Sequence, residues 1–279
     1  MNWCSDLEPS HAASSFGYQN RPSAMTKEQR REQHAQTIAR WIVESEHIVA
    51  FSGAGISTDS GIPDFRGPKG VWTRRNAGLP APRWQVPPNQ VKPNISHLSL
   101  FELQRLGKLQ FLITQNTDNL HRQSGIHPEL LAELHGNARL MRCLGCDRLY
   151  TRQEVGWETS RWGRGYRTQK REPKQPACAA CGGRLISSVV NFGDPLPERE
   201  LALADQHARQ CDLMLVLGSS LVVEPAASLV GQALTSEARV ILANRGKTPY
   251  DEAVTLRVWT GIADVIPPAV ERVKGVLGE

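Results

Sequence analysis

A short apolar run followed at once by two glycines places the strongest constraint on the fold of this chain. Ile48 to Phe51 is long enough for a strand that is buried on both faces of a parallel sheet. Gly53 and Gly55 come next, and without Cβ atoms the backbone can turn tightly there and bring N–H groups against a diphosphate. The next glycine is Gly61, so the spacing matches neither a strict dinucleotide fingerprint nor a Walker loop. The glycine pair alone is therefore weak evidence for a nucleotide site.

The residues just downstream strengthen this interpretation. Pro63, Asp64, Phe65 and Arg66 place a stiff ring, an acid, an aromatic face and a fixed cation beside the turn. Through Arg66 the chain carries the signature GAGIS…GIPDFR without a break, and in this it resembles the sirtuin family of NAD-dependent protein deacylases. The following segment, GPKGVW, is similar to the branch that contains the nuclear, chromatin-associated sirtuins.

Strand-like and helix-like segments alternate along most of the chain, which predicts an α/β fold with a doubly wound, Rossmann-like parallel sheet. We expect strands at residues 48–51, 109–114, 131–134, 187–191, 213–217, 239–243 and 254–258. We expect helices at residues 26–46, 97–106 and 198–210, from about residue 224, and at 262–277.

The alternation is interrupted once, and this predicts the domain organisation. Residues 1–25 are polar and without periodicity, which favours a flexible tail. Residues 26–137 and 187–279 are expected to form the Rossmann-like NAD-binding domain, and residues 138–186 an inserted four-cysteine zinc module. Residues 74–93, rich in Pro, Arg and Asn, are expected to form a mobile flap over a ligand.

Two Cys-x-x-Cys pairs predict one zinc ion per chain. Four thiolates on two tight knuckles complete a tetrahedron, leave no position for water, and so indicate a structural metal. The four predicted ligands are Cys143, Cys146, Cys178 and Cys181. Cys211 precedes an apolar run and is expected to be a small buried hydrophobic residue.

The long gap between the two cysteine pairs is basic and aromatic. Cations interleaved with aromatic rings can contact nucleic acid or an acidic partner. A solvated, partly disordered insertion is the alternative, and composition alone favours it. The cations are Arg161, Arg164, Arg167, Lys170, Arg171 and Lys174, and the aromatic residues are Trp157, Trp162 and Tyr166.

Polar residues follow two of the predicted strands at the edge where ligands bind in open α/β sheets. Gln115, Asn116 and Asp118 offer amides and an acid that can pair with a carboxamide such as that of nicotinamide. A turn held by its own side chains is the alternative. His135 follows the other strand and can act as a general base near neutral pH, although a lone histidine is more often structural.

The resemblance to sirtuins implies roles for these residues. Every fixed position of the family motif TQN-x-D-x-LH is met, with Thr117 at the position where Ile or Val is common. The resemblance implies that His135 is the catalytic base, that Asn116 and Asp118 are also catalytic, and that His121 orders the loop.

A cofactor site and a peptide site are also implied by the resemblance. The cofactor residues are Gly53, Ala54, Gly55, Ile56, Asp64, Phe65, Arg66, Trp72, Gln115, Asn116, Asp118, Gly218, Ser219, Ser220, Asn244 and Ala263. An acyl-lysine peptide would add as a strand through main-chain hydrogen bonds. The peptide contacts would come from Val190, Asn191, Phe192 and Gly193. Asp194 replaces the usual Glu here, and Asn191 replaces a larger apolar residue.

The resemblance spans about residues 26–275 and implies a reaction. An acyl-lysine and NAD would give lysine, nicotinamide and O-acyl-ADP-ribose, on a Rossmann-like domain with a small zinc domain. An NAD hydrolase or ADP-ribosyltransferase is the alternative on the same fold, with water or a protein nucleophile as acceptor. A nucleic-acid-binding zinc module with an NAD sensor domain is an alternative of another class.

The net charge and the hydropathy of the chain constrain its function only weakly. The net charge of +5 is mildly basic, and ordinary surface lysine and arginine explain it as well as an acidic partner does. No apolar run approaches membrane-spanning length, and the polar N-terminus lacks the apolar core of a signal peptide. We therefore expect an intracellular protein without membrane contact, cytoplasmic or, in a eukaryote, nuclear.

Overall fold

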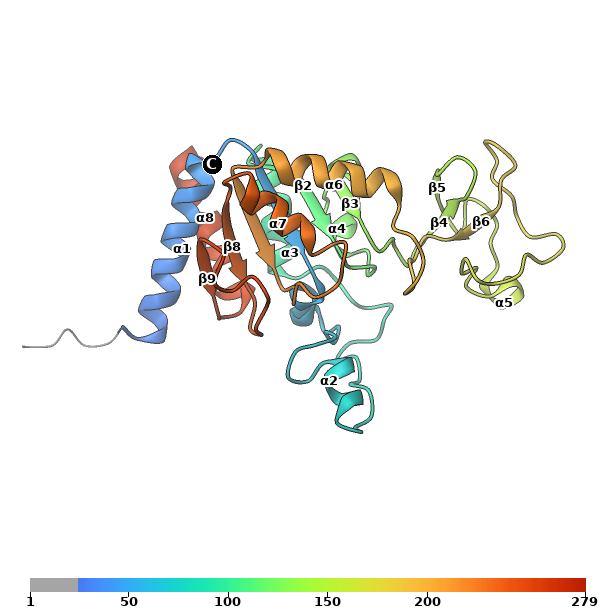
Figure 1. The fold of residues 1–279 in the computed structure, drawn as a ribbon, viewed down its shortest axis with the longest axis horizontal. Helices are drawn as coiled ribbons and strands as arrows, with labels where there is room; N and C mark the ends of the chain where they lie inside the picture. Colours follow the sequence, from blue (N-terminus) through green and yellow to red (C-terminus); the bar gives the residue numbers. More distant parts are fainter. Residues whose placement is uncertain (1–24) are drawn as a thin grey trace, which may run out of the picture.

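A six-stranded parallel sheet forms the centre of the computed structural model, which describes residues 25–279 (Figure 1). Its strand order is β3-β2-β1-β7-β8-β9. The strands are β1 (Ile48–Ser52), β2 (Leu109–Thr114), β3 (Leu131–Glu133), β7 (Leu213–Leu217), β8 (Arg239–Ala243) and β9 (Leu256–Val258). The predicted doubly wound α/β class is confirmed. The tail predicted for residues 1–25 lies, except for its last residue, outside the described residues.

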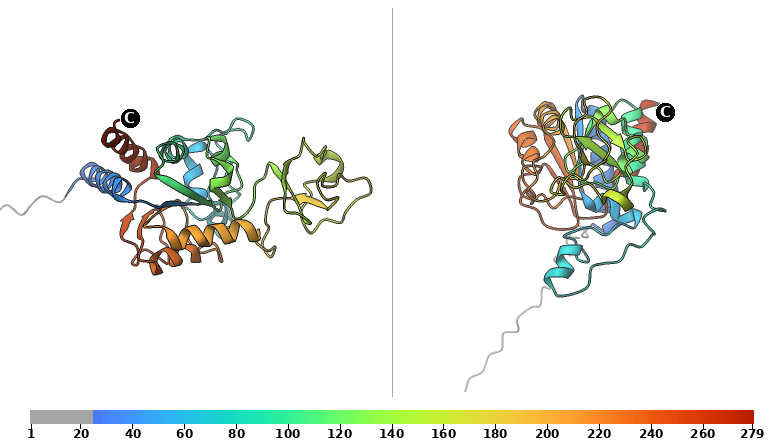
Figure 2. Two further views of the ribbon diagram at one scale, coloured as in Figure 1. Left: turned by 90° about the horizontal axis from the view of Figure 1, so that it is seen from above. Right: turned by 90° about the vertical axis from the view of Figure 1, so that its right-hand side faces the viewer.

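Helices cover both faces of this sheet (Figure 2). The first layer contains α1 (Lys27–Glu44), α3 (Ile95–Arg105) and α8 (Ile266–Leu277), and the second contains α6 (Glu198–Gln210) and α7 (Ser228–Thr235). Alternation along β1 builds the two cores, because Ile48 and Ala50 pack with the first layer while Val49 and Phe51 pack with the second. A capping box of Thr26 and Gln29 starts α1, in agreement with the helix expected from residue 26.

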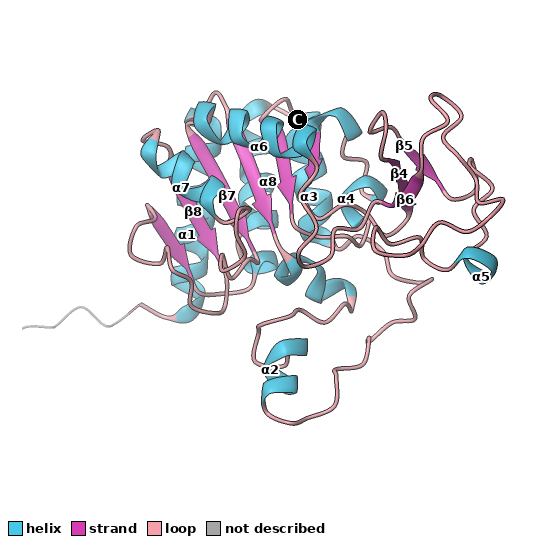
Figure 3. Cartoon of the chain, turned by 45° about the vertical axis from the view of Figure 1, so that its right-hand side comes forward, coloured by secondary structure: helices cyan, strands magenta, loops and turns pink. Residues whose placement is uncertain are grey.

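Shorter elements connect these layers. They are the 3₁₀ turns η1 (Ala54–Ser60), η2 (Pro128–Leu130) and η3 (Ile262–Asp264), and the short helices α2 (Val71–Asn76) and α4 (Leu120–Gln123). The segment with α2 projects from the main body below the sheet (Figure 3). Among residues 25–279, no helix combines the length and the apolar character that crossing a bilayer requires.

The cysteine-bearing segment forms a separate three-stranded antiparallel sheet of order β5-β4-β6, visible at the right of Figure 1. Its elements are β4 (Leu140–Cys143), β5 (Leu149–Thr151), α5 (Thr159–Trp162) and β6 (Leu185–Ser187). Trp157 is only 6% exposed in a small core with Met141 and Leu185, and its indole N–H donates to the Gly163 carbonyl. The aromatic part of the insertion therefore packs in a small core, whereas its predicted cations between residues 161 and 174 are exposed to solvent.

A buried ion pair joins this small sheet to the main domain. Arg142 on β4 bonds to Glu200 on α6 at 3.0 Å, and to Asp147 of its own module at 2.6 Å. The side chains of Arg142 and Glu200 are 7% and 14% exposed. The pair connects the module to the N-terminal part of α6, and removal of either partner would leave the other charge buried without compensation.

Several predicted boundaries are wrong. The strand predicted at 187–191 is instead β6, which ends at Ser187 and pairs with β4, because the next residues leave the small sheet. A turn around Glu224–Pro225 delays the helix predicted there, which begins at Ser228. The predicted flap begins inside α2, and the last strand begins only at Leu256.

Candidate active site

The site is built where β1 and β7 end side by side. The Gly53 amide donates to the Leu217 carbonyl, and the Gly55 amide donates to the Gly218 carbonyl at 2.8 Å. A Cβ on Gly55 would lie 2.7 Å from the Gly218 Cα, so no larger residue fits there. This differs from the expectation that both glycine N–H groups face a diphosphate. The glycines instead let two strand-end turns approach one another closely.

Ser57 connects the predicted carboxamide-binding side chains. Its hydroxyl donates to Asp118 Oδ2 at 2.6 Å and accepts from the Asn116 amide at 3.2 Å. The same Asn116 amide donates to the Gly53 carbonyl at 3.1 Å, which leaves its side-chain carbonyl oxygen to accept from a ligand. The loop thus holds an amide and an acid in fixed orientations.

Burial raises the pKa of Asp118, and bonds from Ser57 and from the Leu120 amide counter that rise. A buried carboxylate is stabilised in its charged form by each additional donor. An amide N–H from a ligand would be such a donor. His121 lies behind this loop, buried, with Nε2 2.8 Å from the Ser52 hydroxyl.

His135 presents one defined nitrogen to a ligand. Its Nδ1 lies 3.0 Å from the Gln115 carbonyl oxygen, which can only accept, so Nδ1 carries the proton. Nε2 therefore holds the lone pair. Burial lowers the pKa of His135 and keeps the ring neutral at physiological pH, although the bond to Gln115 acts in the opposite direction. A neutral imidazole with a free Nε2 can take up a proton.

A cavity of about 1150 Å³ brings the predicted residues together. Its described lining includes Gly53, Ala54, Gly55, Asp64, Phe65, Arg66, Trp72, Gln115, Asn116, Asp118, His135, Val190, Asn191, Phe192, Gly193, Gly218, Ser219, Ser220 and Asn244. Two predicted cofactor residues are not part of the lining. Ile56 is buried in the core, and Ala263 lies beside the lining residues Gly261 and Ile262.

Sequence reasoning missed some of the lining residues. Arg245 follows Asn244 at the carboxyl end of β8, so the strand-end rule could have found it. Lys247 carries no comparable signal. Ser57 carries none either, because a single serine in a glycine-rich turn can have many roles. Arg245 and Lys247 give this end of the cavity the positive charge that suits a diphosphate.

Three aromatic residues, Phe65, Trp72 and Phe192, form another part of the cavity lining. Trp72 lies 6.4 Å from Phe65 and 6.5 Å from Phe192, measured between ring centroids. Phe192 is 81% exposed, so this apolar rim is open to an incoming chain. The turn beneath the rim is held by the Asp64 carboxylate, which accepts from the Gly67 amide at 2.9 Å.

The predicted peptide-binding segment is hydrogen-bonded to the backbone of His135. The Val190 amide donates to the His135 carbonyl at 2.9 Å. Asn191 and Asp194, the two departures noted in the sequence, interact with each other, because Asp194 accepts from the Asn191 backbone amide at 3.1 Å. The two substitutions therefore form one turn.

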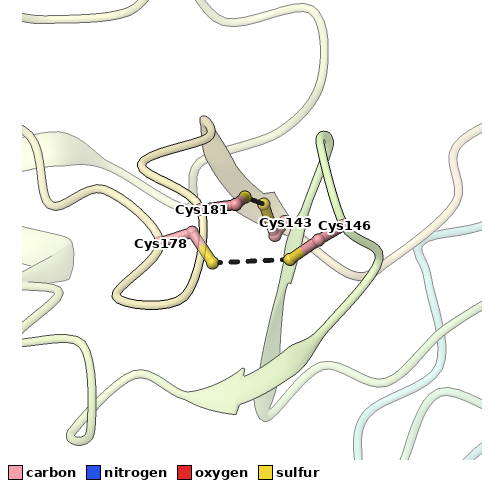
Figure 4. Close-up of side chains that lie close together, drawn as sticks. All are labelled: Cys143, Cys146, Cys178 and Cys181. Carbon is pink, nitrogen blue, oxygen red and sulfur yellow. Dashed lines mark hydrogen bonds between the residues drawn. The ribbon is translucent and has the colours of Figure 1, made fainter.

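The four predicted zinc ligands converge (Figure 4). All four sulfur atoms lie within 4.8 Å of one another, with Cys143 3.4 Å from Cys181 and Cys146 3.6 Å from Cys178. A zinc ion with Zn–S bonds of about 2.3 Å separates its sulfurs by roughly 3.8 Å. The arrangement therefore fits one tetrahedral zinc ion with no open position.

Sequence comparison gives a consistent family. A family model described as the Sir2 family matches residues 53–83 and 81–225. The NAD-dependent protein deacetylase SRT1 of Arabidopsis thaliana is 37% identical over 84% of this chain and 48% of that protein. An NAD-dependent protein deacetylase of Thermodesulfovibrio yellowstonii is 36% identical over 84% of this chain and 93% of that protein. The chain thus spans about half the length of its plant relatives.

Solved structures agree with this result. A structure described as Sir2 with a p53 peptide and NAD+ is 32% identical, has a TM-score of 0.64, and covers 87% of this chain and 98% of that chain. A structure of Sir2Af2 bound to a myristoylated histone peptide is 30% identical, has a TM-score of 0.62, and covers 88% and 99% of the two chains.

Proposed function

Because the chain belongs to the Sir2 family, we propose that it removes acyl groups from protein lysine side chains with NAD as co-substrate. The products would be the free lysine, nicotinamide and O-acyl-ADP-ribose. The observation that carries this proposal is the position of His135, whose free Nε2 lines the same cavity as Asn116 and Asp118.

Each group then has one task. NAD, when bound, supplies the ribose carbon that receives the acyl oxygen as nicotinamide departs. Asn116 and Asp118 orient the carboxamide of the leaving group, and Ser57 fixes both side chains. The exposed rim of Phe65, Trp72 and Phe192 offers an apolar surface that a bound peptide would cover, and this would exclude water from the site. Nε2 of His135 takes a proton from a ribose hydroxyl so that the acyl group can move.

We also assign a structural zinc ion to the inserted module, held by Cys143, Cys146, Cys178 and Cys181. Four thiolates leave no site for a reacting water, so the metal would stabilise the fold only.

Nicotinamide release distinguishes deacylation from the alternatives on the same fold. The purified protein is incubated with NAD, with and without one acetyl-lysine peptide, and nicotinamide and peptide mass are measured. We expect nicotinamide and deacetylated peptide to form in equal amounts and only together. Release that is independent of the peptide would identify an NAD hydrolase, and a peptide mass increased by ADP-ribose would identify a transferase.

A second proposal concerns the basic insertion, which we propose contacts nucleic acid. Its support is that Arg161, Arg167, Lys170, Arg171 and Lys174 are all exposed and, within residues 25–279, take part in none of the ion pairs. Binding of a labelled duplex should weaken steeply with salt. Equal binding after these cations are changed to Gln would exclude the proposal.

A further inference from the structure

The lining of the large cavity extends across the sheet to a loop at residues 244–247. Lining residues occur in the order of the strands, with Gly53 after β1, Gly218 after β7 and Asn244 after β8. A dinucleotide binds across such a row of carboxyl ends. With nicotinamide held beside Asn116 at the end of β2, the adenosine half therefore lies towards β8.

Arg257 fixes this loop through the carbonyl groups of the loop. Its guanidinium donates to the Asn244 carbonyl at 2.7 Å and to the Gly246 carbonyl at 2.6 Å. The Asn244 side-chain amide also donates to the Gly246 carbonyl, at 3.0 Å. The backbone amides of Arg245, Gly246 and Lys247 donate to no group in the described part of the chain. The loop thus uses two of its acceptors for its own fold and keeps three donors for a ligand.

Two side chains of the loop add positive charge. Arg245 and Lys247 line the cavity, are exposed, and belong to none of the ion pairs among the described residues. The Arg245 guanidinium reaches the turn after β9, because its Nη2 would lie 2.9 Å from a Cβ placed on Gly261. Asp264 lies in the same turn, but it already accepts from the Gly261 amide at 3.0 Å and pairs with Arg31 at 3.3 Å.

Dinucleotide-binding domains distinguish NAD from NADP at the adenosine ribose, where an acid accepts from the 2′-hydroxyl or an Arg accommodates the 2′-phosphate. The loop at 244–247 contains no acid. Among the carboxylates of the cavity lining, Glu224 is nearest in the order of the strands, since it follows β7. It already accepts from the Ser228 amide at 3.1 Å. The loop therefore lacks the acid that is typical of a site restricted to NAD.

A phosphate dianion accepts hydrogen bonds, whereas a hydroxyl also needs an acceptor for its own proton. Three free amides beside two unpaired cations therefore suit a phosphate. We propose that this loop binds the phosphate of a phosphorylated adenosine ribose, so that the site takes NADP as well as NAD. Asn244 Oδ1 remains as an acceptor for the other ribose hydroxyl. This inference rests on the NAD site of the proposed function and names its phosphate specificity.

The diphosphate is the other group that these cations could bind, and the test separates the two. Calorimetry at one fixed salt concentration gives the affinity of the purified full chain for ADP-ribose and for 2′-phospho-ADP-ribose. The diphosphate is common to both ligands, so the ratio of the two dissociation constants isolates the ribose phosphate. We expect the wild type to bind the 2′-phosphorylated ligand more tightly by roughly ten- to a hundred-fold, the range for charged hydrogen bonds.

Matched variants locate the effect. Arg245→Gln and Lys247→Gln should each reduce the preference for the 2′-phosphorylated ligand by roughly tenfold. Both positions are exposed, so neither change should disturb the fold. Arg199→Gln is the control, because Arg199 is exposed on α6, outside the cavity lining and, as far as the structure describes the chain, in no ion pair. It should keep the wild-type preference.

Two results would overturn the inference while leaving the proposed function intact. One is equal or weaker binding of the 2′-phosphorylated ligand by a wild type that binds ADP-ribose. The other is a loss of affinity by the same factor for both ligands in the two variants, which would assign the cations to the diphosphate. Peptide-dependent nicotinamide release from NAD is measured on the same preparation. Its absence would refute the proposed function, and the calorimetry would still decide whether the loop binds a ribose phosphate.

Discussion

At the scale of single residues, His135 and the Gln115 carbonyl define a base with one free nitrogen. His135→Ala should lower deacylation by roughly 10²–10⁴, the usual contribution of a positioned general base. NAD should still bind, and nicotinamide exchange should fall less than deacylation, because the base acts after nicotinamide has left. All four quantities (melting temperature, NAD binding, exchange and deacylation) are measured on the one variant.

A structural histidine would give another pattern. Melting temperature, binding, exchange and deacylation would then all fall together. Near wild-type deacylation in folded His135→Ala protein would end the proposed mechanism. The pH profile adds a second check, because burial lowers the pKa of His135. Rate should be lost only as the pH falls below 6.5, where the imidazole takes up a proton and can no longer act as a base.

The pair Asn116 and Asp118 belongs to the same scale. Asn116→Ala or Asp118→Ala should lower kcat/KM for NAD by roughly tenfold or more and weaken inhibition by nicotinamide, since each removes a hydrogen bond to the carboxamide. The melting temperature should change little, because the loop lies outside the two hydrophobic cores. Wild-type kinetics with NAD in either variant would remove these residues from the site.

Sequence reasoning found residues that line one cavity where a motif follows a strand end, and it failed where the partner is distant in the chain. Asn116, Asp118 and His135 were predictable because they follow strand ends in a recognised pattern. Ser57 was not, since its use depends on a fold that brings it against Asp118 across 61 positions. The hydrogen bond of the Gly55 amide was not predictable either, because its acceptor lies in a turn more than 160 residues away.

At the scale of elements, the inserted module depends on its metal. Cys143→Ala should remove zinc and unfold the module, because metal binding free energy is coupled to folding. Elemental analysis should give one zinc ion per chain for the wild type and for Cys211→Ala, the control with a buried cysteine outside the cluster. Active, folded protein without zinc would contradict the assignment.

Helices and strands with strong local signals were predicted closely, and the exceptions have local causes. The capping box of Thr26 and Gln29 fixed the start of α1. The apolar runs of β2, β7 and β8 fixed their bounds. The run at 187–191 contains only two apolar residues, Val189 and Val190. Its first residue pairs with β4 and the Val190 amide donates to the His135 carbonyl, which no periodicity reveals.

At the scale of the whole molecule, the alternation of strand-like and helix-like segments predicted the parallel sheet. The contacts between the main domain and the inserted module, in contrast, arise from side chains that are far apart in sequence. The Arg142–Glu200 pair lies at that junction, and so does a cavity of about 570 Å³ whose lining includes Arg139, Arg152 and Arg164. Neither can be derived from spacing, because each depends on how the module meets the main domain.

Stability in acid is also a property of the whole molecule, and His97 controls part of it. Its ring is buried in α3, where Nδ1 accepts from the Asn94 amide, and burial lowers its pKa to about 4 from 6.5. The unfolded chain binds this proton near pH 6.5, so the contribution to stability is complete above pH 6.5 and is lost as the pH falls towards 4. The loss amounts to about 3 kcal/mol for this one group.

His97→Gln isolates the effect, because Gln is a usual residue at this position of a capping box and cannot titrate. Urea unfolding is measured for both proteins at pH 7.5 and at pH 4.5. The wild type should lose about 2 to 3 kcal/mol more than the variant between the two conditions. His121, whose pKa is lowered by burial and then by the charge of His97, remains in both proteins and should leave a residual loss in the variant. Equal losses would show that His97 is protonated without cost in the folded state.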